Sequence, residues 1–131
     1  MMKVRGYIFS RPFLGERVPQ SVQNLVIRDY CIKNSLFLLL SATEYAMEGS
    51  DLMLFKVNNE LKKIDGIVAY SLFQLPEDNY RREIFFKSIL EKNKKLFFAL
   101  ESMSLESSND IENINMLWNI KKTLPDCINK I

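Results

Sequence analysis

Short apolar runs alternate with amphipathic segments along this chain, and that alternation limits the folds it can adopt. The apolar runs are rich in β-branched and aromatic residues and predict four strands, at residues 4–10, 36–42, 66–71 and 95–101. Apolar residues at helical spacing predict four helices, at residues 21–34, 50–63, 79–93 and 109–124. Such alternation with short connections gives a mostly parallel sheet covered by helices. We therefore expect an α/β fold with a small, mostly parallel four-stranded sheet in a three-layer arrangement, followed by a C-terminal helix.

At 131 residues the chain is expected to form one α/β domain, residues 1–131, with a core over about residues 4–105. The run LFLLLSA is apolar throughout, which is typical of a strand buried on both faces. Pro125 is expected to end the last helix. Trp118 is expected to pack in the core. A role in pairing the C-terminal helix with a second copy stays open.

The residue types that are missing or rare exclude several kinds of chemistry. The chain has no histidine, so it lacks the commonest general base and every imidazole metal ligand. Its two cysteines, Cys31 and Cys127, form no CxxC pair, and we expect no metal site. There is no G-x-G-x-x-G turn and no P-loop, and we expect no cofactor. Cys31 falls in an expected helix and should be a buried thiol.

Location and partners are also limited by composition. The first residues do not follow the pattern of a secretory signal peptide, and the longest apolar run, LFLLL, is far shorter than a membrane span. We expect a cytoplasmic protein that does not bind membranes. The net charge of +2 is too small to indicate a nucleic-acid-binding protein.

Polar side chains gather where the expected strands end. In sheets of this kind, ligands bind beyond the carboxyl ends of the strands. The residues at or just after those ends are Ser10, Arg11, Glu44, Tyr45, Ser71, Gln74, Glu77 and Glu101. Any one of them could simply cap a helix or bond to loop backbone. Taken together, and with long polar loops after the first two strands, they predict a polar site at this edge.

Four stretches of the sequence resemble one family of small bacterial proteins over almost the whole chain. They read RGYIFSRPFLGERVPQSVQNLVIRDYC, LLSATEYAMEGS, DGIVAYSLFQLPED and FALE. The family is named for sporadic carbohydrate clusters, and its members are encoded among genes for surface-polysaccharide synthesis. The resemblance implies a pathway and does not imply a particular reaction.

Residues 4–105 also resemble, more distantly, the catalytic domain of serine recombinases, the resolvase and invertase group. The order of the expected elements agrees, and YIFS ends in Ser10 where that family has its nucleophilic serine. Glu44 lies near an acid of theirs after the second strand, and Gln20 or Gln23 near a glutamine. The resemblance implies a resolvase-like or flavodoxin-like scaffold.

The charged positions of the recombinase pattern are not kept in this chain. The pattern has an arginine two residues before the serine, where Ile8 stands here. It has an aspartate and two arginines after the third strand, where this chain has Phe73, Gln74 and Glu77. Preorganised charge is the largest contribution to stabilising such a transition state. The arginines that could compensate are Arg11, Arg17, Arg81 and Arg82. We expect no recombinase activity and no binding of nucleic acid.

Two functions stay open. The first is binding or modification of a sugar or nucleotide sugar, since planar polar side chains and carboxylates suit sugar hydroxyls and a guanidinium suits a phosphate. In that hypothesis Ser10 and Glu44 are the candidate catalytic residues. The candidate substrate-binding residues are Arg11, Arg17, Gln20, Tyr45, Ser71, Gln74, Glu77 and Glu101. Binding is easier to derive than covalent catalysis, because no histidine or obvious lysine could activate the serine.

The second hypothesis is a non-catalytic module that regulates or scaffolds other polysaccharide-synthesis enzymes. A recombinase-like scaffold without its arginines fits that role. The C-terminal helix could then bind those enzymes or form a homodimer.

Overall fold

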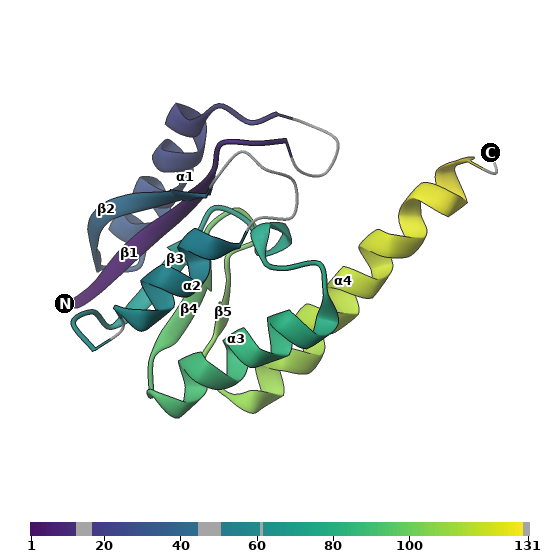
Figure 1. The fold of residues 1–131 in the computed structure, drawn as a ribbon. Coiled ribbons are helices and arrows are strands. Elements are labelled where there is room, and N and C mark those ends of the chain that lie inside the picture. The colour runs from purple at the N-terminus through teal and green to yellow at the C-terminus, as the bar shows by residue number, and fades with distance from the viewer. Residues whose placement is uncertain (13–16, 45–50, 61, 130–131) are drawn as a thin grey trace.

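A computed structural model describes residues 1–12, 17–44, 51–60 and 62–129 and shows an α/β fold (Figure 1). The strands are β1 (Met2–Phe9), β2 (Leu36–Glu44), β3 (Gly66–Ala69), β4 (Lys95–Phe98) and β5 (Met103–Leu105). The helices are α1 (Gln20–Lys33), α2 (Leu52–Asn59), α3 (Asn79–Glu91) and α4 (Ser108–Asn129), with one 3₁₀ turn, η1 (Leu72–Gln74). The strand order is β2-β1-β3-β4-β5; the first four strands are parallel and β5 is antiparallel to β4.

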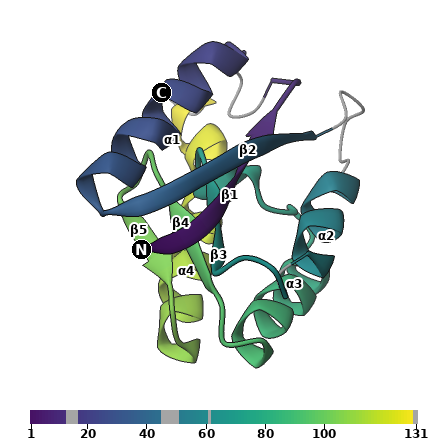
Figure 2. The same ribbon diagram turned by 90° about the vertical axis from the view of Figure 1, so that its left-hand side faces the viewer.

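The sheet forms the middle of three layers, as predicted. Helix α1 covers one face, while α2 and α3 lie on the other (Figure 2). On the α1 face, Ile27 and Cys31 pack against Val4 and Ile8 of β1. Burial raises the pKa of the Cys31 thiol to about 11, which fits its predicted role as a small apolar residue. The helices on the opposite face, with the first half of α4, enclose the larger part of the core.

The sheet has five strands where the sequence predicts four. Strand β4 ends at Phe98, and the chain turns back through Ser102 into β5, whereas the prediction continued the strand to residue 101. Ser102 adopts a left-handed backbone with φ of 52°, a conformation that glycine or asparagine would normally signal. The turn therefore carries no recognisable marker, and the strand after it has only three residues.

Two other expectations about the elements are wrong. Strand β2 is not buried on both faces, because it is the edge strand and the helices cover it only in part; Phe37 is 52% exposed and Leu40 is 87% exposed. Pro125 does not end the last helix, since α4 continues to Asn129 and extends beyond the other elements (Figure 1). Trp118 is buried on α4, as predicted. No helix in the described ranges combines the length and apolar composition of a membrane span.

Gly66 lets β3 approach the neighbouring strand closely. It begins β3 and pairs with Lys95, the first residue of β4. A Cβ atom at Gly66 would lie against the Lys95 carbonyl oxygen, which is part of the backbone and cannot rotate away. The central strands can therefore align at this end only because the residue has no side chain.

We expect Gly66→Ala to lower the free energy of unfolding by about 1–3 kcal/mol, because the added methyl group must displace backbone. Urea unfolding measures the change. Gly6→Ala is the comparison: its Cβ would meet the Ser41 hydroxyl, a side-chain group that can rotate, so its cost should be smaller. Equal stability of Gly66→Ala and the parent protein would contradict this packing.

Candidate functional site

The first two strands end side by side at the predicted edge of the sheet, which we call the strand-end rim. Phe9 and Glu44, the last residues of β1 and β2, are register partners. The hydroxyl of Ser10 donates a hydrogen bond of 2.7 Å to the backbone carbonyl of Glu44. Ser10 is half-buried, and its oxygen keeps acceptor capacity. The two candidate catalytic residues are therefore neighbours, but the contact uses the Glu44 backbone.

The Glu44 carboxylate, at the end of β2, is buried and accepts hydrogen bonds from β1 and α2. Its side chain accepts hydrogen bonds from the Tyr7 hydroxyl at 2.8 Å and from the backbone N–H groups of Met53 and Leu54 at 3.1 and 3.2 Å. Those N–H groups belong to the first turn of α2, where a negative charge is stabilised. Burial, with the adjacent Glu44 carboxylate, raises the pKa of Tyr7. This geometry gives Glu44 a structural role that ties β1 and β2 to α2.

Gln23 of α1 is the centre of the strand-end rim. Its side-chain oxygen accepts from the Phe9 N–H at 2.9 Å and from the Gln74 side-chain amide at 2.8 Å. Its side-chain nitrogen donates to the carbonyls of Phe9 at 2.9 Å and Val18 at 2.8 Å. An amide side chain has two acceptor sites and two donors, so every one of them is used. Gln23 joins the end of β1, the start of α1 and the turn after β3.

Ser71 and Glu101 form a second closed set beside Gln74. The Ser71 hydroxyl donates to the Glu101 carboxylate at 2.7 Å, and the other carboxylate oxygen accepts from the Leu72 N–H at 2.9 Å. The side-chain oxygen of Gln74 accepts from the Ser71 N–H at 3.4 Å. Ser71 and Gln74 are 0% and 2% exposed. These side chains satisfy one another and the backbone of the turn.

The arginines after β3 do not supply positive charge at the rim. Arg81 forms a two-point ion pair with Asp51 at 2.6 and 2.7 Å, and these bonds raise the pKa of Arg81. Arg82 is 1% exposed and stacks over the Trp118 ring with its guanidinium carbon 4.8 Å from the ring centre. It donates to the carbonyls of Pro76 and Glu77, and burial lowers its pKa. Both residues hold elements together.

The rest of the strand-end rim is more accessible. Ser10 and Arg11 are partly exposed, while Arg17 and Gln20 are exposed. Because Gln23 bonds to the carbonyls of both Phe9 and Val18, the chain leaving β1 and the chain entering α1 lie side by side. The Arg11 guanidinium carbon lies 4.1 Å from the centre of the Phe9 ring, a cation–π contact. We call residues 10, 11, 17 and 20 the open half of the rim.

The structure thus divides the predicted site residues into two groups. Glu44, Ser71, Gln74 and Glu101 lie at the expected edge and are engaged in internal hydrogen bonds. Ser10, Arg11, Arg17 and Gln20 form the open half, and Glu77 is exposed on the loop before α3. Tyr45 lies outside the described residues. Within the described ranges, no group of three acidic, cysteine or histidine side chains is placed to hold a metal ion.

Sequence reasoning did not identify Gln23 as the organising residue. The signal was present, because Gln23 precedes Ile27 and Cys31 by four and eight residues and shares their buried face of α1. A polar residue in an apolar helical stripe needs internal hydrogen-bond partners. The identity of those partners depends on segments far along the chain.

Comparisons with known proteins support the fold. Among solved structures, the chain is similar to a resolvase family site-specific recombinase from Streptococcus pneumoniae, with a TM-score of 0.63, 11% identity and 97% of each chain covered. It is also similar to the N-terminal catalytic domain of TP901-1 integrase, with a TM-score of 0.54, 13% identity and coverage of 96% of this chain and 97% of that chain. No protein-family model and no curated protein matches the sequence. At this level of identity the likeness shows a resolvase-like fold and no more.

We expect Glu44→Ala to lower the free energy of unfolding by about 3 kcal/mol or more, because the Tyr7 hydroxyl and two backbone N–H groups lose a buried acceptor. Glu77→Ala is the matched control, since it removes the same side chain from an exposed loop and should change stability by less than about 0.5 kcal/mol. Urea unfolding compares the two. A Glu44→Ala variant as stable as Glu77→Ala would show that the Glu44 hydrogen bonds do not hold α2.

Proposed function

We propose that this is a cytoplasmic protein of bacterial surface-polysaccharide synthesis that binds a sugar or nucleotide sugar at the open half of the strand-end rim. The pathway rests on the resemblance of the four sequence stretches to the sporadic carbohydrate-cluster family. The observation that carries the binding site is the division of the rim. One half is buried and closed by mutual hydrogen bonds, whereas Ser10 and Arg11 of the other half are partly exposed and Arg17 and Gln20 are exposed.

The chemistry of the open half suits an activated sugar. Guanidinium groups pair with phosphate oxygens in two-point fashion, so Arg11 and Arg17 bind the phosphate portion. The hydroxyl of Ser10 and the amide of Gln20 bind sugar hydroxyls, which need both donors and acceptors. The exposed Glu77 is a further predicted contact, and Tyr45, the remaining predicted one, lies outside the described residues.

Binding accounts for this arrangement better than covalent catalysis does. The Ser10 hydroxyl donates to a backbone carbonyl and the chain has no histidine, so in the described part of the chain no side chain is placed to act as its general base. The Glu44 carboxylate is engaged by Tyr7 and the first turn of α2 and is 1% exposed. DNA strand cleavage is also disfavoured, because Arg81 and Arg82 are directed to Asp51 and to the core.

A thermal-shift screen against nucleotide sugars tests the proposal. A ligand at 100 times its dissociation constant adds about 2.7 kcal/mol to stability. In a domain of this size that raises the Tm by roughly 10 °C. We expect Arg17→Gln to reduce the shift. Lys87→Gln, which removes one exposed positive charge from α3, should retain it.

Two results would count against sugar binding. The first is a panel in which no nucleotide sugar raises the Tm of the parent protein. The second is a shift that Arg17→Gln and Lys87→Gln change equally, because such an effect depends on net charge and not on the rim. Phosphorus NMR of the same mixtures should show the nucleotide sugar unchanged, and the appearance of a product would show an enzyme.

The second candidate is a non-catalytic module that scaffolds other enzymes of the pathway or forms a homodimer through α4. The observation that favours it is the outer side of α4, where Met116 and Ile120 are 58% and 47% exposed, one helical turn apart. The buried side of the same helix carries Ile114 and Trp118. Exposed apolar residues in such a row are typical of contact surfaces.

If α4 pairs with itself, we expect light scattering after gel filtration to report a dimer. The double variant Met116→Asp, Ile120→Asp should then be a monomer. Leu25→Asp is the control, because Leu25 is an exposed apolar residue of α1. A monomeric parent protein that co-purifies with no polysaccharide-synthesis enzyme would remove this candidate.

A further inference from the structure

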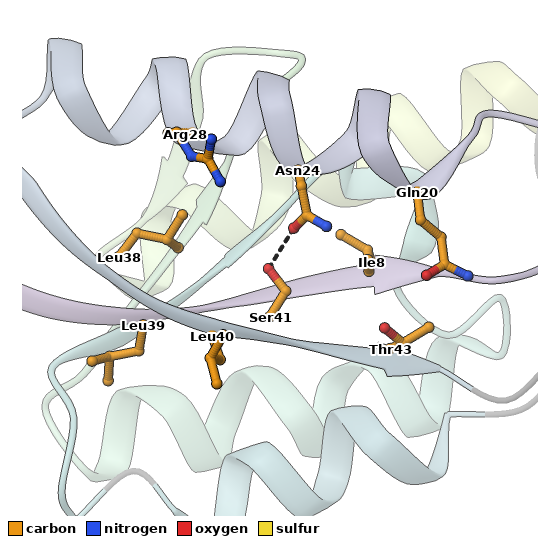
Figure 3. A pocket seen from close by; sticks show the side chains of 9 residues that line it. All are labelled: Ile8, Gln20, Asn24, Arg28, Leu38, Leu39, Leu40, Ser41 and Thr43. Carbon is orange, nitrogen blue, oxygen red and sulfur yellow. Dashed lines mark hydrogen bonds between the residues drawn. The ribbon is translucent and has the colours of Figure 1, made fainter.

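A groove separates α1 from the edge strand β2, beside the strand-end rim (Figure 3). Its volume is about 520 Å³. One wall is formed by Gln20, Asn24 and Arg28 of α1, whose side chains project toward β2. These residues are spaced by four, so they lie on one side of the helix, and the first and last are about 12 Å apart. Gln20 belongs both to this groove and to the open half of the rim.

The opposite wall is shaped by an irregularity in β2. Arg5 pairs with Leu39 but Tyr7 pairs with Ala42, so β2 carries one extra residue opposite Gly6. Such a bulge changes the direction of nearby side chains. Ser41 lies over Gly6, where a Cβ atom would meet its hydroxyl.

That hydroxyl reaches across the groove to α1. Ser41 donates a hydrogen bond of 2.7 Å to the Asn24 side-chain oxygen, which joins the two walls at the middle of the groove (Figure 3). The contact leaves the Asn24 nitrogen, with its two donors, available to a ligand.

Most polar groups of this groove have no hydrogen-bond partner among the described residues, whereas Glu44, Ser71, Gln74 and Glu101 at the rim are engaged. Among the described residues, none bonds to the side chains of Gln20 or Thr43, to the Asn24 side-chain nitrogen or to the Arg28 guanidinium. Arg28 is exposed on α1, whereas neighbouring Asp29 pairs with Lys33 at 2.9 Å. The groove therefore offers donors and acceptors that none of the described residues uses.

The charge of the lining selects one class of ligand. The nine lining residues include one cation, Arg28, and no acid, so the lining favours an anionic group at the Arg28 end. Apolar side chains, among them Ile8 and Leu38, lie between the polar ones and can contact the carbon face of a sugar ring. Hydroxyls of the same ring can bond to the amides of Gln20 and Asn24 and to Thr43.

We infer that the groove between α1 and β2 binds a sugar phosphate, with Arg28 holding the phosphate and Gln20, Asn24 and Thr43 contacting the sugar. This inference rests on the proposed function, which supplies the sugar, and it adds the groove as a binding site beside the open half of the rim, with Arg28 as the residue that holds a phosphate. Gln20 and Arg28 lie about 12 Å apart along α1, so their side chains can contact the two ends of such a ligand.

Titration of the ¹⁵N-labelled protein with glucose 1-phosphate, followed by NMR, tests the site. We expect the side-chain amide signals of Gln20 and Asn24 to shift. Arg28→Gln should weaken binding about tenfold or more, the usual effect of losing one charge-assisted hydrogen bond. Lys87→Gln removes the same charge from α3, on the opposite face of the sheet, and should bind as the parent does.

Three further ligands identify the chemistry that is recognised. Glucose alone should bind at least tenfold more weakly than glucose 1-phosphate, because it lacks the partner of Arg28. Inorganic phosphate alone should also be weaker, because it lacks the ring. Glucuronate of equal or higher affinity would overturn the assignment of a phosphate.

The same titrations distinguish a failure of the groove from a failure of the proposed function. Glucose 1-phosphate that binds equally to Arg28→Gln, with signals shifting only around Ser10 and Arg17, would overturn the groove and leave sugar binding at the rim. If inorganic phosphate binds as tightly as every sugar phosphate, both proposals are overturned and the site holds an adventitious ion only.

Discussion

The hydrogen bonds of the Gln23 side-chain amide hold together the carboxyl end of this sheet. All four of its hydrogen-bonding positions are used, by both backbone groups of Phe9, by Val18 and by Gln74. A buried amide is costly unless it is fully bonded, so the three segments that supply these partners are held at fixed positions. One residue therefore determines where β1 ends, how the chain enters α1 and where the turn after β3 lies. Through Gln74 and Phe9 it also holds part of the strand-end rim closed.

The chain shares a resolvase-like fold with two solved recombinase structures, but its side chains after the third strand are engaged within the domain. Where the recombinase pattern has charged side chains after the third strand, Gln74 bonds to Gln23 and Phe73 packs edge-on against Trp118, with ring centres 5.3 Å apart. The arginines that remain nearby, Arg81 and Arg82, join α3 to other elements. These side chains therefore stabilise the fold, and a similar fold does not by itself imply a similar activity.

The sequence was sufficient to predict the fold class and the edge of the sheet where polar residues gather. Both depend on the spacing of apolar residues and on strand ends, which are local properties. It was not sufficient to separate engaged from available side chains. Ser71 bonds to Glu101 across 30 residues and Gln74 to Gln23 across 51, so their partners are set by the strand order. The hairpin into β5 was missed for another reason, since Ser102 carries no glycine-like signal for its left-handed backbone.

Helix α1 connects the closed rim to the groove beside it. Gln23 and Asn24 are consecutive, so the bonds that fix Gln23 in the core also fix the direction of Asn24 toward Ser41. Gln20 and Arg28 lie one turn on either side of Asn24 and share that orientation. A wall held in place before a ligand arrives lowers the ordering cost of binding. The buried Gln23 amide thus has two consequences. It engages polar groups at the strand ends, and it fixes the orientation of α1, which directs Gln20, Asn24 and Arg28 toward the groove.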